Sequence, residues 1–161
     1  MMSGELAGSG EFIQVPLYEG TVGAGPSGGI VTDVKLDKYP FKRAWVEKVA
    51  GTSSHRQADL VLIRVSGDSM CPTINAGELV LVDQWDMGRY NIQNGRIYLI
   101  TEGDGLIHLK RLLLNRVDEK VRIVLVSDNP AYPPKEIEIP AGEGLSKYVL
   151  GRVRWAGREF E

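Results

Sequence analysis

Short apolar segments separated by turn residues fill most of the chain after residue 60. Six segments are rich in Val, Ile, Leu or Tyr and have the length of strands: Leu60–Val65, Leu79–Val82, Arg96–Thr101, Leu106–Leu112, Val121–Val126 and Tyr148–Trp155. The intervening sequences are typical turns, namely Asn75-Ala76-Gly77, Asn94-Gly95, Gly103-Asp104-Gly105 and Asp128-Asn129-Pro130. This pattern predicts a mainly β fold of short strands with a barrel-like or sandwich-like arrangement.

The first part of the chain has a different character. Residues 1–10 are rich in Gly and Ser, and Phe12–Tyr18 is a short extended stretch. Residues 20–29 contain five glycines and a proline, which favour an exposed, adaptable loop because ordering them costs backbone entropy. We therefore expect residues 1–29 to form a flexible arm and residues 30–161 to form the folded domain.

One short helix is predicted between residues 41 and 50. Pro40 stands before it and Gly51 stands after it, which is the usual asymmetry of proline at the start and glycine at the end. Phe41, Trp45 and Val49 recur every four residues and give the helix one apolar face.

Composition limits the classes of protein that fit. The 161 residues are enough for one domain, and a formal net charge of −2 with no basic stripe argues against nucleic-acid binding by this chain alone. Cys71 is the single cysteine, so no internal disulfide or cysteine metal cluster can form. No signal peptide and no apolar run of membrane-spanning length is visible, which favours the cytoplasm. No cofactor and no metal is expected.

The segment Val65-Ser66-Gly67-Asp68-Ser69-Met70-Cys71-Pro72-Thr73-Ile74 carries the candidate chemistry. A strand ends near Gly67, and Pro72 stops it from continuing, so the Ser69 hydroxyl is expected at the lip of the sheet. Backbone N–H groups beside it could stabilise an oxyanion. Taken alone, a serine in such a turn is most often only a turn residue.

Further residues match an ordered pattern that resembles the S24 peptidase family, which includes LexA-type SOS repressors, lambdoid phage repressors and the mutagenesis protein UmuD. The matching residues are Gly67-Asp68-Ser69-Met70, Pro72-Thr73-Ile74, Gly77-Glu78, Leu79–Asp83, Asn94–Tyr98, Lys110-Arg111-Leu112, Ser127–Pro133 and Gly151-Arg152-Val153. The resemblance covers about residues 12 to 158 and implies a LexA-like β fold. It also implies the self-cleaving, dimerising C-terminal domain of a repressor.

The resemblance assigns Ser69 as nucleophile, Lys110 as general base, and the backbone N–H groups of Asp68 and Ser69 as the oxyanion site. Serine needs a base, and Ser–Lys pairs are a known variant of the catalytic triad. A free lysine is charged at neutral pH, but burial in an apolar strand such as Leu106–Leu113 lowers its pKa. By position alone, Lys110 would be read as a surface lysine.

Neighbouring residues receive more modest interpretations. Strand alternation places His108 and Lys110 on one face and Arg111 on the other. His108 is expected at the rim of the site without a catalytic role, and Arg111 as a solvated or interface charge. Cys71 is expected to pack, and Asp68 to shape the turn through hydrogen bonds.

The resemblance also implies a substrate inside the chain, the Ala24–Gly25 bond within Val22-Gly23-Ala24-Gly25-Pro26. Tethering would make the attack by Ser69 unimolecular. Gly23 replaces the more usual small aliphatic residue, and Pro26 restricts Gly25. The simpler alternative is a plain hinge.

Four functions remain open. A self-cleaving repressor domain leads, and a non-cleaving regulatory and dimerisation module or a UmuD-like mutagenesis protein follows. A signal peptidase comes last, because that enzyme works at a membrane and no anchor is visible in this sequence. A homodimer through the strand near Val149–Trp155 is expected, with RecA filaments as the trigger if the chain follows LexA. DNA would be contacted only through a helix-turn-helix domain outside this sequence.

Overall fold

The computed structural model describes residues 10–24, 30–51, 59–84 and 92–160. Its elements are, in chain order, β1 (Phe12–Ala24), β2 (Ile30–Lys42), α2 (Arg43–Ala50), β3 (Leu60–Arg64), β4 (Leu79–Asp83), β5 (Ile97–Ile100), β6 (His108–Val117), β7 (Lys120–Val126), β8 (Lys135–Ile139), the 3-10 helix η3 (Leu145–Lys147) and β9 (Val149–Gly157). The mainly β fold predicted from the sequence is confirmed.

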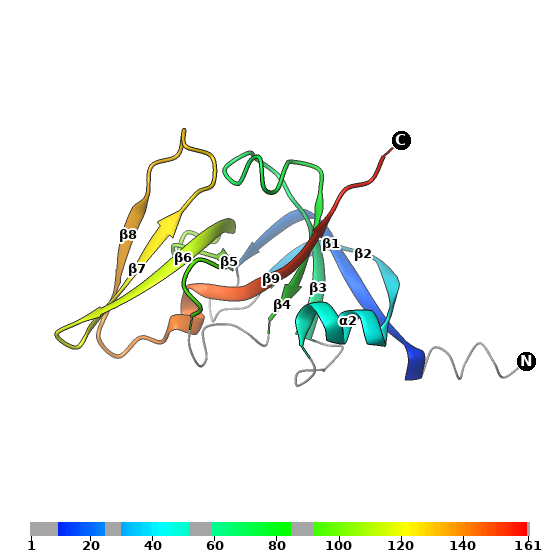
Figure 1. The fold of residues 1–161 in the computed structure, drawn as a ribbon, viewed down its shortest axis with the longest axis horizontal. Coiled ribbons are helices and arrows are strands. Elements are labelled where there is room, and N and C mark those ends of the chain that lie inside the picture. The colour runs from blue at the N-terminus through cyan, green and yellow to red at the C-terminus, as the bar shows by residue number, and fades with distance from the viewer. Residues whose placement is uncertain (1–9, 25–29, 52–58, 85–91, 161) are drawn as a thin grey trace, which may run out of the picture.

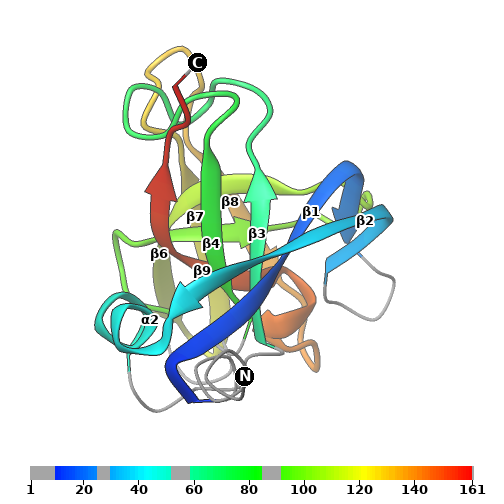
Figure 2. The same ribbon diagram turned by 90° about the vertical axis from the view of Figure 1, so that its right-hand side faces the viewer.

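All nine strands belong to one sheet in the order β2-β1-β3-β4-β9-β5-β6-β7-β8. Neighbours are antiparallel except for β1 and β3, which are parallel and pair only at Leu17 with Leu62 and Tyr18 with Ile63. The last strand, β9, lies between β4 and β5 and joins the β1–β4 part of the sheet to the β5–β8 part (Figure 1). The sheet is strongly twisted, so the two parts cross in Figure 2.

The central strands are buried on both faces, which explains their continuous apolar sequences. In β3, Leu60 and Leu62 belong to one core cluster, whereas Val61 and Ile63 belong to a second cluster on the other face. A third cluster, under β5–β9, contains Tyr98, Ile100, Leu112, Ile123 and Val149. The middle of the sheet is therefore mostly apolar, although the buried Asp83 of β4 is an exception.

The helix α2 covers the face of the first core cluster. It begins at Arg43 rather than Phe41, because Phe41 and Lys42 still pair with β1 as the end of β2. It ends at Ala50 before Gly51, whose φ of 86° is a backbone conformation that glycine adopts without strain. The predicted apolar face is confirmed, since Phe41 stacks on Trp45 with 5.2 Å between ring centroids and both rings contact Trp155.

Parts of the sheet were not predicted from the sequence. Residues 20–24, expected in a loop, are the outer end of β1, where the backbone pairs with β2 from Val22 opposite Thr32 to Ala24 opposite Ile30. This pairing supplies the hydrogen bonds that offset the entropy of the glycines. The other missed elements, β2 and β8, are the two edge strands of the sheet, and both contain several charged residues.

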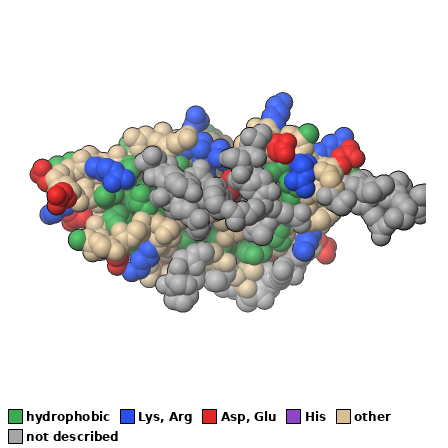
Figure 3. Space-filling model, turned by 90° about the horizontal axis from the view of Figure 1, so that it is seen from below, with side chains coloured by type: hydrophobic (Ala, Val, Ile, Leu, Met, Phe, Trp, Pro, Cys, Tyr) green, Lys and Arg blue, Asp and Glu red, His purple; other side chains and the backbone are tan. Residues whose placement is uncertain are grey.

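Charges of both signs are interspersed over the face shown in Figure 3, in agreement with the lack of a basic stripe in the sequence. Within the described ranges, no helix is both long enough and apolar enough to cross a membrane.

Candidate active site

The turn after β3 presents Ser69 half-buried at the end of the central sheet. Met70 and Ile74 are buried in the second core cluster and hold the segment down, while Ser66, Gly67 and Asp68 are exposed. Within the segment, the Cys71 N–H donates to the Asp68 carbonyl at 3.1 Å and the Ile74 N–H donates to the Met70 carbonyl at 3.0 Å. Anchored apolar residues on one side therefore leave the serine facing outward.

A second turn closes this segment and explains the Gly77-Glu78 part of the motif. The buried Glu78 carboxylate accepts a hydrogen bond from the Asn75 backbone N–H at 2.7 Å and another from Arg158 Nε at 3.0 Å. These hydrogen bonds lower the pKa of Glu78 and keep its carboxylate charged, and the bond from Asn75 has the larger effect. The carboxylate thus fixes the chain where it re-enters the sheet as β4.

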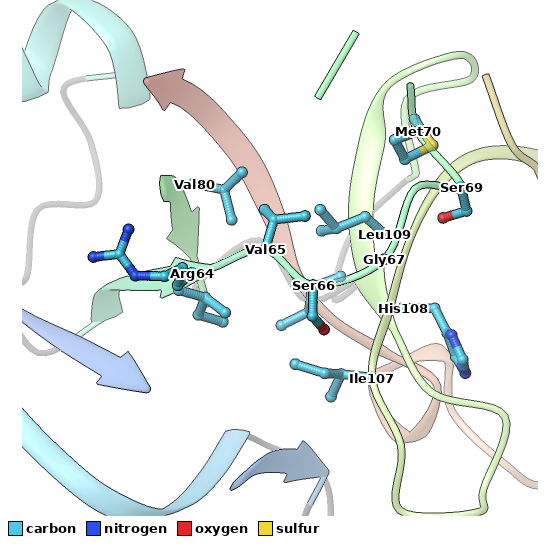
Figure 4. A pocket seen from close by; sticks show the side chains of 12 residues that line it. Arg64, Val65, Ser66, Gly67, Ser69, Met70, Val80, Ile107, His108 and Leu109 are labelled. Atoms are coloured by element: carbon cyan, nitrogen blue, oxygen red, sulfur yellow. The ribbon is translucent and has the colours of Figure 1, made fainter. Parts of the chain in front are cut away.

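A pocket lined by both apolar and polar residues lies beside Ser69 (Figure 4). The strand and turn residues Ile63, Val65 and Met70 line one side, and Ile107, His108 and Leu109 line the other. An adjoining hollow shares much of this lining and extends to Glu19 on β1. The two together form a groove that runs from the β1–β2 hairpin to the nucleophile turn. His108 lines the groove, as predicted.

Lys110 extends from β6, opposite Tyr98 of β5. Its side chain is partly buried, and this desolvation lowers the pKa of Lys110, while the negative charge of Glu102 opposes the shift. Its Nζ donates a hydrogen bond to Ser127 Oγ at 2.5 Å and lies 5.4 Å from the centroid of the Tyr132 ring. In the part of the chain that the structure describes, no hydrogen bond joins Lys110 Nζ to Ser69 Oγ.

The loop after β7, residues 127–132, contacts both candidate residues, and we call it the clamp loop. The Asn129 backbone N–H donates to the Ser69 carbonyl at 3.0 Å, and Asn129 Nδ2 donates to the Asp68 carbonyl at 3.0 Å. The Tyr132 hydroxyl donates to Asp68 Oδ1 at 2.5 Å. Asp68 therefore shapes the turn through backbone and side-chain bonds, as predicted.

The clamp loop is itself held by an ion pair. Arg111 donates to Asp128 through Nε at 2.7 Å and Nη2 at 2.9 Å, and its Nη1 donates to the Gly95 carbonyl. Thr73 donates to the same carboxylate at 2.5 Å. Both hydrogen bonds lower the pKa of Asp128, and the bond from Arg111 has the larger effect. The prediction that Arg111 is a solvated or interface charge was wrong, because this half-buried guanidinium is used inside the fold.

The backbone N–H groups of Asp68 and Ser69 donate no hydrogen bond within the described residues. They are thus available at the turn, which is a requirement for an oxyanion site. Cys71 is a half-buried free thiol next to this turn. The described residues contain no group of three or more His, Cys, Asp or Glu side chains that could hold a metal ion.

The candidate cleavage bond follows the last residue of β1. Ala24 is the last residue of β1, and Gly25 lies outside the described residues. Gly23 passes so close to the Gly105 carbonyl that a Cβ atom would lie 2.5 Å from its oxygen. This contact gives a physical reason for glycine at position 23, where the resemblance led us to expect a small aliphatic residue.

Sequence reasoning named Ser69 and Lys110 but gave no role to Ser127, Asn129 or Tyr132. The only signal was that Ser127–Pro133 matched the ordered pattern. Their contacts depend on how β6 pairs with β7, which the linear sequence does not show.

The site thus combines a serine at a sheet-end turn, a groove beside it and a partly desolvated lysine that the clamp loop joins to the serine turn. The Peptidase S24-like family model matches residues 16–154, and the chain belongs to this family. The "26 kDa repressor protein" of Escherichia phage HK022 is 30% identical over 149 residues, which are 92% of this chain and 59% of the phage protein. An "Uncharacterized HTH-type transcriptional regulator" of Haemophilus influenzae is 37% identical over 96 residues, which are 59% of this chain and 36% of that protein. The chain therefore spans less than two thirds of the length of both relatives.

Proposed function

We propose that this chain is the self-cleaving C-terminal domain of a transcriptional repressor, with Ser69 and Lys110 as its catalytic dyad. The observation that carries the proposal is the clamp loop, which binds the Ser69 turn through Asn129 and Lys110 through Ser127. A loop that contacts both groups keeps them in a fixed relation, as catalysis by an oriented pair requires. Hydrogen bonds between catalytic groups often tighten only when substrate binds, so a missing bond between Ser69 and Lys110 in the free site is compatible with the proposal.

The reaction follows from the chemistry of the groups. Neutral Lys110 takes the proton of Ser69, and Ser69 Oγ adds to the Ala24 carbonyl carbon, whose oxygen is held by the Asp68 and Ser69 N–H groups. The bond from Ala24 to Gly25 then breaks, and the proton on Lys110 passes to the leaving amino group of Gly25. Water hydrolyses the Ser69 ester and frees the nucleophile. Ala24 would reach Ser69 along the groove that begins at Glu19.

A repressor context fits the relatives, one of which is named a repressor and the other a helix-turn-helix regulator. In this proposal the DNA-binding part lies outside the sequence given, the protein acts in the cytoplasm as a homodimer, and an SOS-type signal such as a RecA filament triggers cleavage. β4 pairs with β9 from Arg152 to Gly157, whereas β5 pairs with it only from Val149 to Arg152, so the end of β9 has a strand neighbour on one side only among the described strands.

A non-cleaving regulatory domain is the second candidate. The observation that favours it is the bond of Lys110 to Ser127, which leaves the amine engaged away from Ser69. The two candidates differ in one result, the appearance of cleavage products.

The test is incubation of the purified chain at about pH 9.5, where more of Lys110 is neutral, followed by intact mass spectrometry. We expect a fragment that begins at Gly25, its absence in Ser69→Ala and in Lys110→Ala, and its presence in the matched controls Ser146→Ala and Lys120→Ala. Ser146 and Lys120 are exposed, and neither lines the groove beside Ser69. No fragment from the unmodified chain, or an undiminished fragment from Ser69→Ala, would leave only the regulatory function.

A further inference from the structure

Ser127 occupies a defined position opposite the candidate base. β6 and β7 pair with Arg111 opposite Val126, so the next step of the register puts Ser127, the first residue after β7, beside Lys110 on the same face. Its hydroxyl accepts the hydrogen bond of the lysine amine, at 2.5 Å. Ser127 is half-buried, so this hydrogen bond is shielded in part from solvent.

The position of the Ser127 hydroxyl is fixed by its neighbours in the chain. Asp128, the next residue, is held by Arg111 and Thr73, and Asn129 is held against the carbonyls of Asp68 and Ser69. The strand pairing of β7 with β6 fixes the residue on the other side. Ser127 therefore has little freedom to follow the flexible lysine side chain, and the lysine must come to it.

This contact restricts the amine in a way that suits a base. A neutral amine has two N–H bonds and one lone pair, and donation of one N–H to a fixed hydroxyl limits where the lone pair points. The other groups around the amine do not direct it in this way. Tyr132 contributes the face of a ring at 5.4 Å, Glu102 acts through charge, and His108 lies two residues earlier on the same strand face.

We propose that Ser127 is a positioning residue, which holds Lys110 by accepting its N–H so that the lone pair is directed toward Ser69. The inference rests on the proposed function, since positioning has a consequence only if Lys110 acts as a base. It adds a third side chain to the dyad and assigns a role to the first residue of the clamp loop.

The first test compares self-cleavage rates at about pH 9.5 in the unmodified chain, Ser127→Ala, Ser127→Thr and the control Ser146→Ala. We expect Ser127→Ala to cleave about 10- to 100-fold more slowly, because a misplaced base loses rate steeply. Ser127→Thr keeps the hydroxyl and should retain most of the rate. Equal rates for Ser127→Ala and the unmodified chain would overturn the proposal. So would a Ser127→Thr protein that is folded by circular dichroism but as slow as Ser127→Ala.

The second test does not depend on cleavage. In the Ser69→Ala background, the titration of Lys110 is followed by nitrogen-15 NMR of the lysine side chains, with Lys110→Arg to assign the signal. Ser127 accepts from the ammonium and so favours the charged form, and its removal should lower the pKa of Lys110 further. An unchanged pKa would show that the contact is not made in solution. If the unmodified chain never cleaves, the proposed function fails, and this titration still decides whether Ser127 holds Lys110.

Discussion

The clamp-loop end of the molecule and the β1–β2 hairpin are held in very different ways. Around Ser69, Asn129 and Tyr132 donate hydrogen bonds to one short turn, and Asp128 accepts one from Thr73 in the same segment. Among the hairpin side chains whose burial is described, the fully buried ones are Ile13, Val15 and Leu17 at the inner end, and Tyr18 and Ile30 are partly buried against the second core cluster. Beyond Tyr18, β1 pairs only with β2, and its register is irregular between Glu19 and Val22. The nucleophile turn is thus held by several side-chain hydrogen bonds, whereas in the described part of the hairpin β1 beyond Tyr18 is held by its pairing with β2 and by the ion pair of Glu19 with Arg64.

This difference suits a protein that acts on itself. A preorganised site needs no reorganisation at the moment of reaction, whereas a substrate segment has to enter and leave the groove. Local stability is low where few buried apolar contacts hold the backbone. Breaking the firm end should therefore affect the whole fold, and changes at the hairpin should remain local.

The largest effect on stability is expected for Asp128→Asn, which removes the charge that pairs with Arg111. We expect a loss of about 1–3 kcal/mol in the free energy of unfolding, because a half-buried guanidinium loses its charged hydrogen-bond partner. Denaturant unfolding followed by circular dichroism measures the change. The matched control is Glu138→Gln, whose exposed pair with Lys120 should contribute less than about 1 kcal/mol. Equal effects of the two substitutions would show that the clamp loop is not held as described.

The same ion pair predicts a pH dependence. Because the folded-state pKa of Asp128 is lowered, its contribution to stability is present above the unfolded pKa and is lost as pH falls through the folded value. The difference in stability between the unmodified chain and Asp128→Asn should therefore shrink as the pH falls below about 4. A difference that stays constant through this acidic range would contradict the assignment of the pair.

A smaller effect on the free energy of unfolding is expected for Gly23→Ala in the hairpin. The added Cβ would lie 2.5 Å from the Gly105 oxygen, so the outer end of β1 must move away. Hydrogen exchange should become faster in residues 19–24 and remain unchanged in β3 and β4. Faster exchange throughout the sheet would mean that the hairpin and the core are one cooperative unit, and that the hairpin is not the more weakly held region.

The smallest effect is expected for Tyr132→Phe. The change removes the hydroxyl that donates to Asp68 but keeps the ring beside Lys110. Two bonds from Asn129 still hold the turn, so the melting temperature should hardly change and self-cleavage should slow only severalfold. Abolished cleavage would assign Tyr132 a more direct part in the reaction.

The sequence predicted the central strands well because they are buried on both faces, and a continuous apolar run such as Leu79–Val82 is typical of a strand in that position. It did not predict β2 or β8, whose Asp, Lys and Glu residues resemble those of loops. The sequence also did not predict the hairpin between β6 and β7. Its two turn residues, Asp118 and Glu119, have positive φ without glycine or asparagine, so the usual turn signal is missing.

Only part of the candidate site could be predicted from the sequence. Ser69 and Lys110 stand in ordered motifs, and the apolar residues around Lys110 correctly indicated a lowered pKa. The bond between Lys110 and Ser127 joins residues 17 positions apart. It exists only because the turn at Asp118 sets the register of β6 on β7, and no local pattern encodes that register.

The order of the cleavage reaction tests the central claim most directly. The release of the fragment that begins at Gly25 should be measured at about pH 9.5 over a wide range of protein concentrations. If Ser69 attacks a bond in its own chain, the first-order rate constant will be independent of concentration, and Ser69→Ala will release nothing. A rate that rises with concentration, or a fragment with a different first residue, would contradict an internal substrate held by the hairpin.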